Sequence, residues 1–174
     1  ARTGDQRHGF EVADFSDPEQ VRRVADDLVL RAPVHILVNN TGGPPGGPIT
    51  SAQPEQFLAA FRAHLVCNQV LTQAVTPGMK VAGYGRIINI ISTSVKQPIP
   101  GLGVSNTIRG AVASWAKTLA GELGPFGITV NNVLPGFTTT ERLASLISAR
   151  ANASQSPEDR IASEMKATIP AARF

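Results

Sequence analysis

The sequence contains one cysteine, Cys67, among its 174 residues. A single thiol cannot form a disulfide within the chain, and it cannot supply the several thiolates of a cysteine-based metal site. We therefore expect no structural metal. A reducing compartment, the cytoplasm, fits this cysteine usage best.

Long apolar runs and basic runs are also missing. No stretch approaches the ~18 apolar residues of a membrane span, and the first ten residues, ARTGDQRHGF, are too polar for a signal peptide. The formal charge of +3 comes from Lys and Arg scattered among acids, without the interleaved aromatics of a nucleic-acid groove. We expect a cytoplasmic, globular protein with neither a membrane nor a nucleic-acid partner.

Four short segments rich in β-branched residues predict strands, at residues 8–14, 34–40, 86–92 and 128–134. The third holds Ile87, Ile88, Ile90 and Ile91, an apolar run typical of a strand buried on both faces of a parallel sheet. Stretches with helical spacing separate the segments. This alternation predicts a single α/β domain over residues 1–174, with the order β-α-β-α-β-α-β.

Capping patterns predict where the helices begin. The first helix should start at Ser16 or Asp17 with Pro18 in its first turn, and the second near Pro54. A third has apolar residues at 3.6-residue spacing from 104 to 123, before Gly124 and Pro125. Weaker patterns at 143–147 and 160–165 predict two small helices over the carboxyl edge of the sheet.

Ligands of open α/β sheets bind outside the carboxyl ends of the strands, so the loops at that edge are the candidate site. The loop after the second predicted strand, NNTGGPPGGP, has four glycines that would let the backbone approach a flat ligand; a plain flexible turn is the alternative. It is not a P-loop, because no Gly-Lys-Ser/Thr follows, and the chain has no G-x-G-x-x-G.

The order of these features resembles the short-chain dehydrogenase/reductase family, especially its ketoacyl-carrier-protein reductase-like branch. LVNNTGG matches the family's N-N-A-G element, and VNNVLPGFTTT matches its N-x-x-x-P-G-x-x-x-T element. The resemblance covers nearly the whole chain. It implies a Rossmann-like, doubly wound parallel sheet in a three-layer α/β/α arrangement, NAD or NADP as cofactor, a small-molecule carbonyl or alcohol substrate, and a homodimer or homotetramer.

The same resemblance implies roles at the cofactor. Asp14 would contact the adenine ring, although a carboxylate at a helix entry is the alternative. The wall beside the adenosine ribose would be formed by Asn39, Asn40, Thr41 and Gly42. The nicotinamide would be lined by Pro135, Gly136 and Thr140, where the alternative for the Pro-Gly pair is an ordinary turn after a strand.

The family's catalytic residues are a Ser, a Tyr thirteen residues later, a Lys four residues after the Tyr, and an Asn on the preceding helix. Ser92 matches the Ser, whereas Ser105, Arg109 and His64 stand at the other three positions. A phenol can be brought to exchange protons near neutral pH, but an alkyl hydroxyl is a far weaker acid. Arg109 keeps a charge that could bind ribose hydroxyls, yet it holds its proton too firmly to relay it.

His64 could replace the missing acid, because its imidazole could donate a proton through water to a carbonyl polarised by Ser92. The alternatives are a packed histidine, a capping hydroxyl for Ser105 and a solvated or ion-paired charge for Arg109. Two functions follow: an NAD(P)-dependent oxidoreductase that transfers hydride to or from a carbonyl or secondary alcohol, similar to 3-oxoacyl reductases, or a catalytically inactive binding or scaffold protein with the same fold.

The resemblance also implies that the chain is truncated at both ends. The family's first strand, glycine-rich turn and following helix, its second strand and its last strand should be missing. The strand at 34–40 would then have an exposed edge with uncovered apolar surface. Residues 1–174 alone are expected to bind dinucleotide weakly or not at all, which isothermal titration with NADH and NADPH would test.

Overall fold

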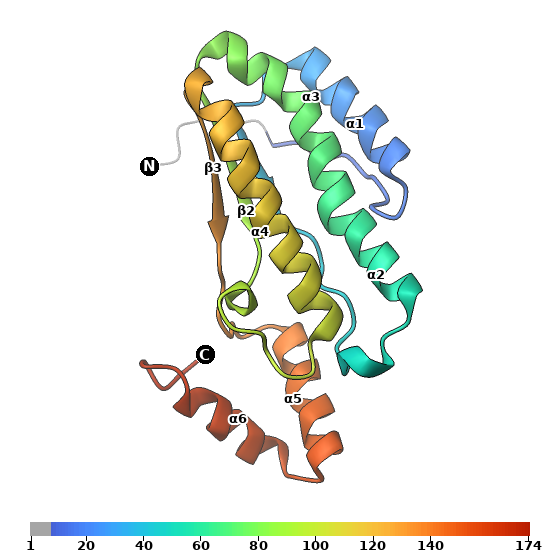
Figure 1. Ribbon diagram of the computed structural model, residues 1–174, viewed down its shortest axis with the longest axis vertical. Coiled ribbons are helices and arrows are strands. Elements are labelled where there is room, and N and C mark those ends of the chain that lie inside the picture. Colours follow the sequence, from blue (N-terminus) through green and yellow to red (C-terminus); the bar gives the residue numbers. More distant parts are fainter. Residues whose placement is uncertain (1–7) are drawn as a thin grey trace. The chain divides into compact units, whose positions relative to one another are not determined.

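The computed structural model describes residues 8–174 and falls into two compact units, Ala1–Val133 and Leu134–Phe174. The helices of the first unit are α1 (Pro18–Arg31), α2 (Pro54–Phe61), a π-helical turn (Arg62–Val66), α3 (Cys67–Ala82) and α4 (Gly103–Leu123). Its strands are β1 (Ile36–Asn39), β2 (Gly85–Ile90) and β3 (Ile128–Val133). The second unit contains α5 (Glu141–Ser154) and α6 (Glu158–Ala167) (Figure 1).

The three strands form one parallel sheet in the order β1-β2-β3. Their register places Asn39 beside Asn89, and Asn89 beside Asn132. A helix connects each strand to the next, as parallel pairing requires. The sheet confirms the predicted Rossmann-like α/β fold and the strands expected within residues 34–40, 86–92 and 128–134.

The strand expected at residues 8–14 does not form, and that prediction was wrong. A β-strand is stabilised by hydrogen bonds to a neighbour, but none of the described strands pairs with this segment. Its side chains at Phe10 and Val12 are 88% and 76% exposed. Phe10 and Val12 favour an extended chain, but a strand also needs a neighbouring strand, which the local sequence does not supply.

The predicted helix boundaries follow local chemistry. Asp17 is the N-cap of α1, and its side chain accepts hydrogen bonds from the backbone N–H groups of Glu19 and Gln20 at 3.0 and 3.2 Å. Pro54 begins α2 as expected, and the helical segment then continues through the π-helical turn into α3. The interruption by a π-helical turn was not predicted.

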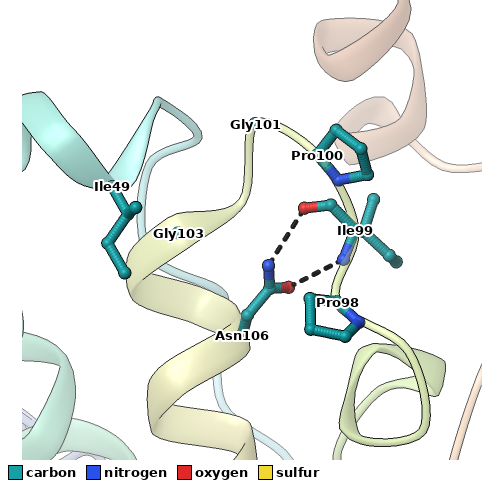
Figure 2. Close-up of a pocket in the computed structure, with 7 residues that line it drawn as sticks. All are labelled: Ile49, Pro98, Ile99, Pro100, Gly101, Gly103 and Asn106. Atoms are coloured by element: carbon teal, nitrogen blue, oxygen red, sulfur yellow. Dashed lines mark hydrogen bonds between the residues drawn. The ribbon is translucent and has the colours of Figure 1, made fainter.

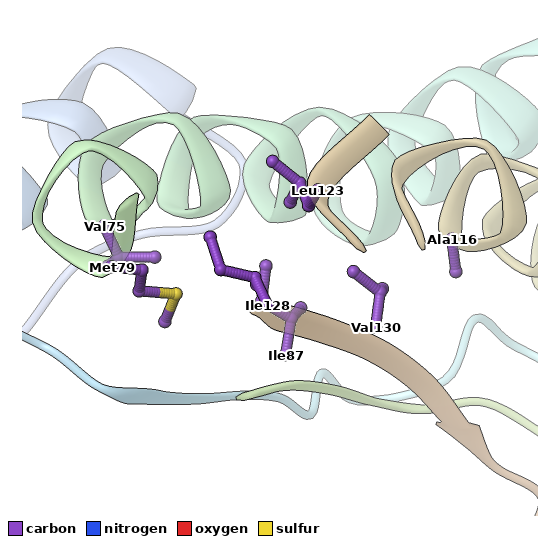
Figure 3. Close-up of a cluster of buried hydrophobic side chains, with 7 residues drawn as sticks. All are labelled: Val75, Met79, Ile87, Ala116, Leu123, Ile128 and Val130. Carbon is purple, nitrogen blue, oxygen red and sulfur yellow. The ribbon is translucent and has the colours of Figure 1, made fainter. Parts of the chain in front are cut away.

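The core lies between the sheet and the helices. Leu37, Ile87 and Val130 occupy one register across the sheet and pack in the same apolar cluster. Figure 3 shows the buried members of this cluster: Val75, Met79, Ile87, Ala116, Leu123, Ile128 and Val130. Apolar burial of this kind is the main stabilising contribution to the fold.

The face of the sheet opposite to this core is not covered by other elements within residues 8–133. Ile36 and Val38, which alternate with Leu37 on β1, are 56% and 54% exposed. This confirms the uncovered apolar surface predicted for the strand at 34–40. Within the first unit the helices cover one face only, so these residues do not form the second helical layer of the expected three-layer arrangement.

Gly103 lets the loop after β1 approach the start of α4 closely. A Cβ at this position would lie 2.6 Å from the Cβ and 2.7 Å from the Cα of Ile49. We expect Gly103→Ala to lower the free energy of unfolding by about 1–3 kcal/mol, because the backbone of Ile49 would have to move. Urea denaturation followed by circular dichroism measures the change.

The matched control is Gly110→Ala in the same helix. A Cβ there meets nothing within 4 Å. Replacing an unobstructed glycine inside a helix by alanine should raise the free energy of unfolding by about 0.5–1 kcal/mol. Equal effects of the two substitutions would contradict the role assigned to the contact at Gly103.

The second unit is a pair of short helices with its own apolar contacts, which confirms the two small helices predicted in the tail. The cluster between α5 and α6 consists of Leu143, Ala151, Ile161 and Met165. Phe137 and Phe174 pack against it with an edge-to-face geometry, their ring centroids 6.2 Å apart. Among residues 8–174, no helix is long and apolar enough to cross a membrane.

Candidate active site

Three asparagines join the strands near their carboxyl ends. Asn39 Nδ2 donates to Asn89 Oδ1 at 2.8 Å, and Asn89 Nδ2 donates to Asn132 Oδ1 at 3.1 Å. Asn39 and Asn89 are buried, with 4% and 1% of their surface exposed. Because each amide offers both a donor and an acceptor, these bonds hold the three strand ends in a fixed register.

Asn39, Asn89 and Asn132 form a chain of two hydrogen bonds, and the acceptor at the Asn39 end of this chain is unused. The buried Asn39 Oδ1 has no hydrogen-bond partner among the described residues. Sequence reasoning assigned Asn39 to the ribose wall and missed Asn89 and Asn132. The available signal was an asparagine near the end of each of the three correctly predicted strands, in LVNN, IINI and VNNV.

Arg109 connects the ends of two strands. Its Nη1 donates to the carbonyl oxygen of Ile90, the last residue of β2, at 2.8 Å. Its Nη2 donates to the carbonyl oxygen of Thr41, two residues beyond β1, at 3.4 Å. The side chain is therefore part of the carboxyl edge of the sheet. Of its alternative interpretation as a solvated or ion-paired charge, the solvated charge was wrong.

Ser105 lies one helical turn before Arg109, as its spacing predicted. The N-cap of α4 is Leu102, and Ser105 is the third residue of the helix itself. The interpretation of its hydroxyl as a helix cap was therefore wrong. Ser105 and Arg109, both half-buried, lie on the same side of α4.

His64 lies in the π-helical turn and is buried, with 2% of its surface exposed. Its Nδ1 is 2.9 Å from the Thr41 hydroxyl oxygen. Burial and, to a smaller extent, the positive charge of Arg109 together lower the pKa of His64 to about 4, although a backbone hydrogen bond with Gly42 opposes both. The imidazole is consequently neutral at pH 7, and Thr41 connects it to Arg109.

A pocket of about 430 Å³ extends from His64 to the glycine-rich loop. Its size lies in the range of small-molecule binding sites. A Cβ added at Gly42 would meet nothing within 4 Å, so the backbone of the loop is open to a ligand. The residues that line the pocket are Gly42, Gly43, Pro44, Pro45, Glu55, Gln56, Ala59, Ala60, Ala63 and His64.

Ser92 and Asp14 have local hydrogen bonds of their own. Ser92 Oγ accepts from the N–H of Ser94 at 3.1 Å and so caps the short turn after β2. The exposed Asp14 carboxylate accepts from the N–H of Ser16 at 2.8 Å, which lowers the pKa of Asp14 below its usual value. Asp14 thus lies just before α1, which agrees with its alternative interpretation as a carboxylate at a helix entry.

The structure brings one group of predicted residues into direct contact: Thr41, Gly42, His64 and Arg109. Asn40 is exposed directly after β1. The predicted nicotinamide contacts Pro135, Gly136 and Thr140 belong to the second unit. There the Thr140 hydroxyl accepts from the N–H of Leu143 at 3.3 Å and caps α5.

The depressed pKa of His64 predicts a pH-dependent stability. The ordinary pKa of 6.5 applies in the unfolded chain, so between pH 6.5 and about 4 the unfolded chain binds more protons than the folded one. Stability therefore falls as the pH is lowered through this window, and we expect a loss of about 2 kcal/mol between pH 7 and pH 5 from this group.

His64→Asn should remove that part of the pH dependence, as measured by urea denaturation at pH 7 and pH 5. His35→Asn, at an exposed histidine that directly precedes β1, controls for the loss of an imidazole. If the parent protein and His64→Asn lose equal stability over this range, His64 is not held neutral by its surroundings.

Comparison with known proteins identifies the family of the chain. The short-chain dehydrogenase family matches residues 2–151 of the chain. The chain belongs to this family. Relatives of the chain in three Streptomyces species carry the name "putative ketoacyl reductase".

Among the relatives of this chain, the "Probable galactose dehydrogenase GalD" of Rhizobium meliloti is 34% identical over 143 residues, covering 82% of the chain and 56% of the relative. An NADPH-dependent aldehyde reductase-like protein of Arabidopsis thaliana is 35% identical over 133 residues, covering 74% and 49%. The chain thus spans about half the length of these relatives.

A solved structure with the same fold is that of the F189W actinorhodin polyketide ketoreductase with NADPH. The two chains are 29% identical and superpose with a TM-score of 0.84, covering 92% of this chain and 63% of the ketoreductase. The comparison supports an oxidoreductase fold of the short-chain type for this chain.

Proposed function

We propose that the protein containing this chain is an NAD(P)-dependent oxidoreductase that transfers hydride between a nicotinamide cofactor and a carbonyl or secondary alcohol, with 3-oxoacyl compounds as the model substrates. The observation that supports it most is the contact of Thr41, His64 and Arg109 at the carboxyl edge of a parallel sheet. Ligands of such sheets bind at that edge.

The residues at this edge fit part of such a cofactor. The open backbone at Gly42 and the exposed Asn40 follow β1 directly, as a wall beside a flat nucleoside requires. By the resemblance to the family, the exposed Asp14 is assigned to the adenine ring, and Pro135, Gly136 and Thr140 of the second unit are assigned to the nicotinamide. The bound cofactor would supply or accept the hydride.

In this proposal Ser92 polarises the substrate carbonyl through its hydroxyl. Ser105 and Arg109 are positioning residues. The guanidinium keeps its proton at every physiological pH and is bonded to two backbone carbonyls, so it orders the strand ends and can face ribose hydroxyls without relaying a proton.

His64 is the candidate for proton transfer. With its pKa near 4, the neutral ring can accept a proton at Nδ1 when an alcohol is oxidised at pH 7, with the Thr41 hydroxyl 2.9 Å away as the adjacent group. Donation to a carbonyl by the imidazolium requires acidic solution, so His64-dependent reduction should accelerate as the pH falls toward 4. Unchanged turnover and pH profile in His64→Ala would remove His64 from the mechanism.

The second candidate function is cofactor or ligand binding without turnover. It is favoured by the serine at the position of the family's acid and by the hydrogen bonds that fasten Arg109 to the Ile90 and Thr41 carbonyls. Both features are compatible with a well-formed cleft that lacks an acid for proton transfer.

Binding and turnover should be measured on the protein that contains this chain. Isothermal titration with NADH and NADPH tests the cleft, and nicotinamide absorbance at increasing concentrations of a 3-oxoacyl ester tests the reaction. Binding with turnover is the expected result. Binding without turnover would favour the second candidate, and the absence of dinucleotide binding would contradict both.

A further inference from the structure

Thr41 and His64, which both differ from the matching residues of the family, form one hydrogen-bonded pair. Thr41 stands at the alanine of the N-N-A-G element, and His64 stands at the position of the family's asparagine. The Thr41 hydroxyl oxygen lies 2.9 Å from Nδ1 of His64, which is 2% exposed. A hydroxyl can donate to a ring nitrogen or accept from it, so the direction of this bond decides which nitrogen of His64 carries the proton.

Gly42 gives the first indication of that direction. Burial and the charge of Arg109 lower the pKa of His64, whereas a backbone hydrogen bond with Gly42 raises it. A backbone group that favours the protonated ring is an acceptor, so the partner of the ring is the Gly42 carbonyl oxygen. The neutral ring has one N–H group, and a carbonyl can only accept. The N–H therefore serves Gly42, and the bond to Thr41, whose hydroxyl can donate, is left to the unprotonated nitrogen, Nδ1.

The charge of Arg109 favours the same direction. Its Nη2 donates to the carbonyl oxygen of Thr41 at 3.4 Å, so the guanidinium is bonded to the residue that Nδ1 of His64 contacts. A positive charge stabilises a nearby lone pair and repels an N–H dipole that points toward it. Both observations put the lone pair of the ring at Nδ1.

Hydrogen bonds at the start of α4 hold Arg109 beside the loop that contains the threonine. Gly103 N–H donates to the carbonyl oxygen of Gly47, in the loop after β1, at 3.2 Å. Asn106 bonds both backbone groups of Ile99: its Nδ2 donates to the carbonyl oxygen at 3.0 Å, and its Oδ1 accepts from the N–H at 3.4 Å (Figure 2). The geometry of the pair is thus fixed by the backbone around it.

We propose that Thr41 is a positioning residue for His64: its hydroxyl donates to Nδ1, the proton of the neutral ring stays on Nε2, and Nδ1 is the nitrogen that can accept a proton. The inference rests on the proposed function for its catalytic consequence, since a neutral ring with its proton on Nδ1 has no lone pair there to accept another. The position of the ring proton itself does not depend on turnover and can be measured separately.

The first experiment locates the ring proton by NMR at pH 7, on the protein that contains this chain with its histidines labelled with a nitrogen isotope. His64→Asn identifies the resonances of His64 by their loss. An unprotonated ring nitrogen resonates far downfield of a protonated one, and it moves part of the way back when it accepts a hydrogen bond. We expect Nδ1 to be unprotonated and hydrogen-bonded. A proton on Nδ1 in the parent protein would overturn the inference.

The second experiment changes the hydroxyl. Thr41→Val removes it and keeps the shape of the side chain, so the Nδ1 resonance should move downfield as its hydrogen bond is lost. Thr41→Ser keeps a hydroxyl and should restore the parent resonance. Thr129→Val, at an exposed threonine of β3, is the matched control and should leave it unchanged. An Nδ1 resonance that ignores Thr41→Val contradicts the inference, and the parent spectrum decides the proton position even if that variant does not fold.

Oxidation of a 3-hydroxyacyl ester, followed by nicotinamide absorbance, separates this inference from the proposed activity. Thr41→Val should lower kcat by at least about tenfold with KM changed less than about twofold, because the base is misplaced while substrate binding is kept. Thr41→Ser should recover most of the lost kcat. If no ester is turned over but Nδ1 has the expected resonance, the proposed function fails and the inference stands. If the protein is active and Thr41→Val keeps its full kcat, the inference fails and the proposed function stands.

Discussion

The double variant Ser105→Tyr/Arg109→Lys is expected to reduce a ketone at least about 100-fold faster than the parent protein. A tyrosine phenol has a pKa near 10, and a neighbouring ammonium lowers it toward the range in which it donates protons at pH 7. A positioned general acid contributes about 10²–10⁴ in rate. Ser105 and Arg109 are one turn apart on α4, and Arg109 already reaches the end of β2 that leads to Ser92.

The matched control is Ser105→Phe/Arg109→Lys, which introduces the same ring without the phenol hydroxyl. It should bind NADH or NADPH as the double variant does and show none of its gain in kcat. Initial rates from nicotinamide absorbance and dissociation constants from isothermal titration separate the two effects. If the tyrosine variant binds cofactor and gains no activity, the missing acid is not what limits the reaction. That result would favour the second candidate function, ligand binding without turnover.

Asn89→Ala is expected to lower the free energy of unfolding by about 3–4 kcal/mol. Asn89 is the middle of the asparagine chain and is 1% exposed. Its removal leaves the buried Asn39 Nδ2 and the half-buried Asn132 Oδ1 without these partners. An unsatisfied buried polar group costs about 1–3 kcal/mol, and the cavity left by the side chain adds to this cost. Urea denaturation monitored by circular dichroism gives the difference.

Asn131→Ala is the control for Asn89→Ala, because Asn131 is an exposed asparagine on the adjacent strand β3. Surface substitutions of this kind usually change stability by less than about 0.5 kcal/mol. A loss at Asn89 no larger than that at Asn131 would show that the asparagine chain does not stabilise the strand ends.

The elements that the sequence predicted correctly depend on local chemistry. Asp17 caps α1 because its carboxylate reaches N–H groups two and three residues ahead, and Pro18 fits the first turn. The apolar spacing from Val104 to Leu123 marks a helix because those residues share one face. Parallel pairing followed from apolar strands separated by helices.

The errors and omissions concern groups whose partners are distant in the chain. Residues 8–14 have the composition of a strand but no described strand pairs with them. The sequence left open whether Arg109 positions a ligand or is a solvated or ion-paired charge, and it could not show that the carbonyls of Ile90 and Thr41, 19 and 68 residues away, accept hydrogen bonds from it. The register that aligns Asn39, Asn89 and Asn132 is a property of the folded sheet.

Composition, periodicity and capping residues determined the α/β class, the parallel strands and the helix starts, because interactions within a few residues set them. Tertiary structure decided that His64 is neutral, that Arg109 ties two strand ends together, and that one face of the sheet in residues 8–133 is open. Those outcomes depend on desolvation, charge and hydrogen bonding between segments that only folding brings into contact.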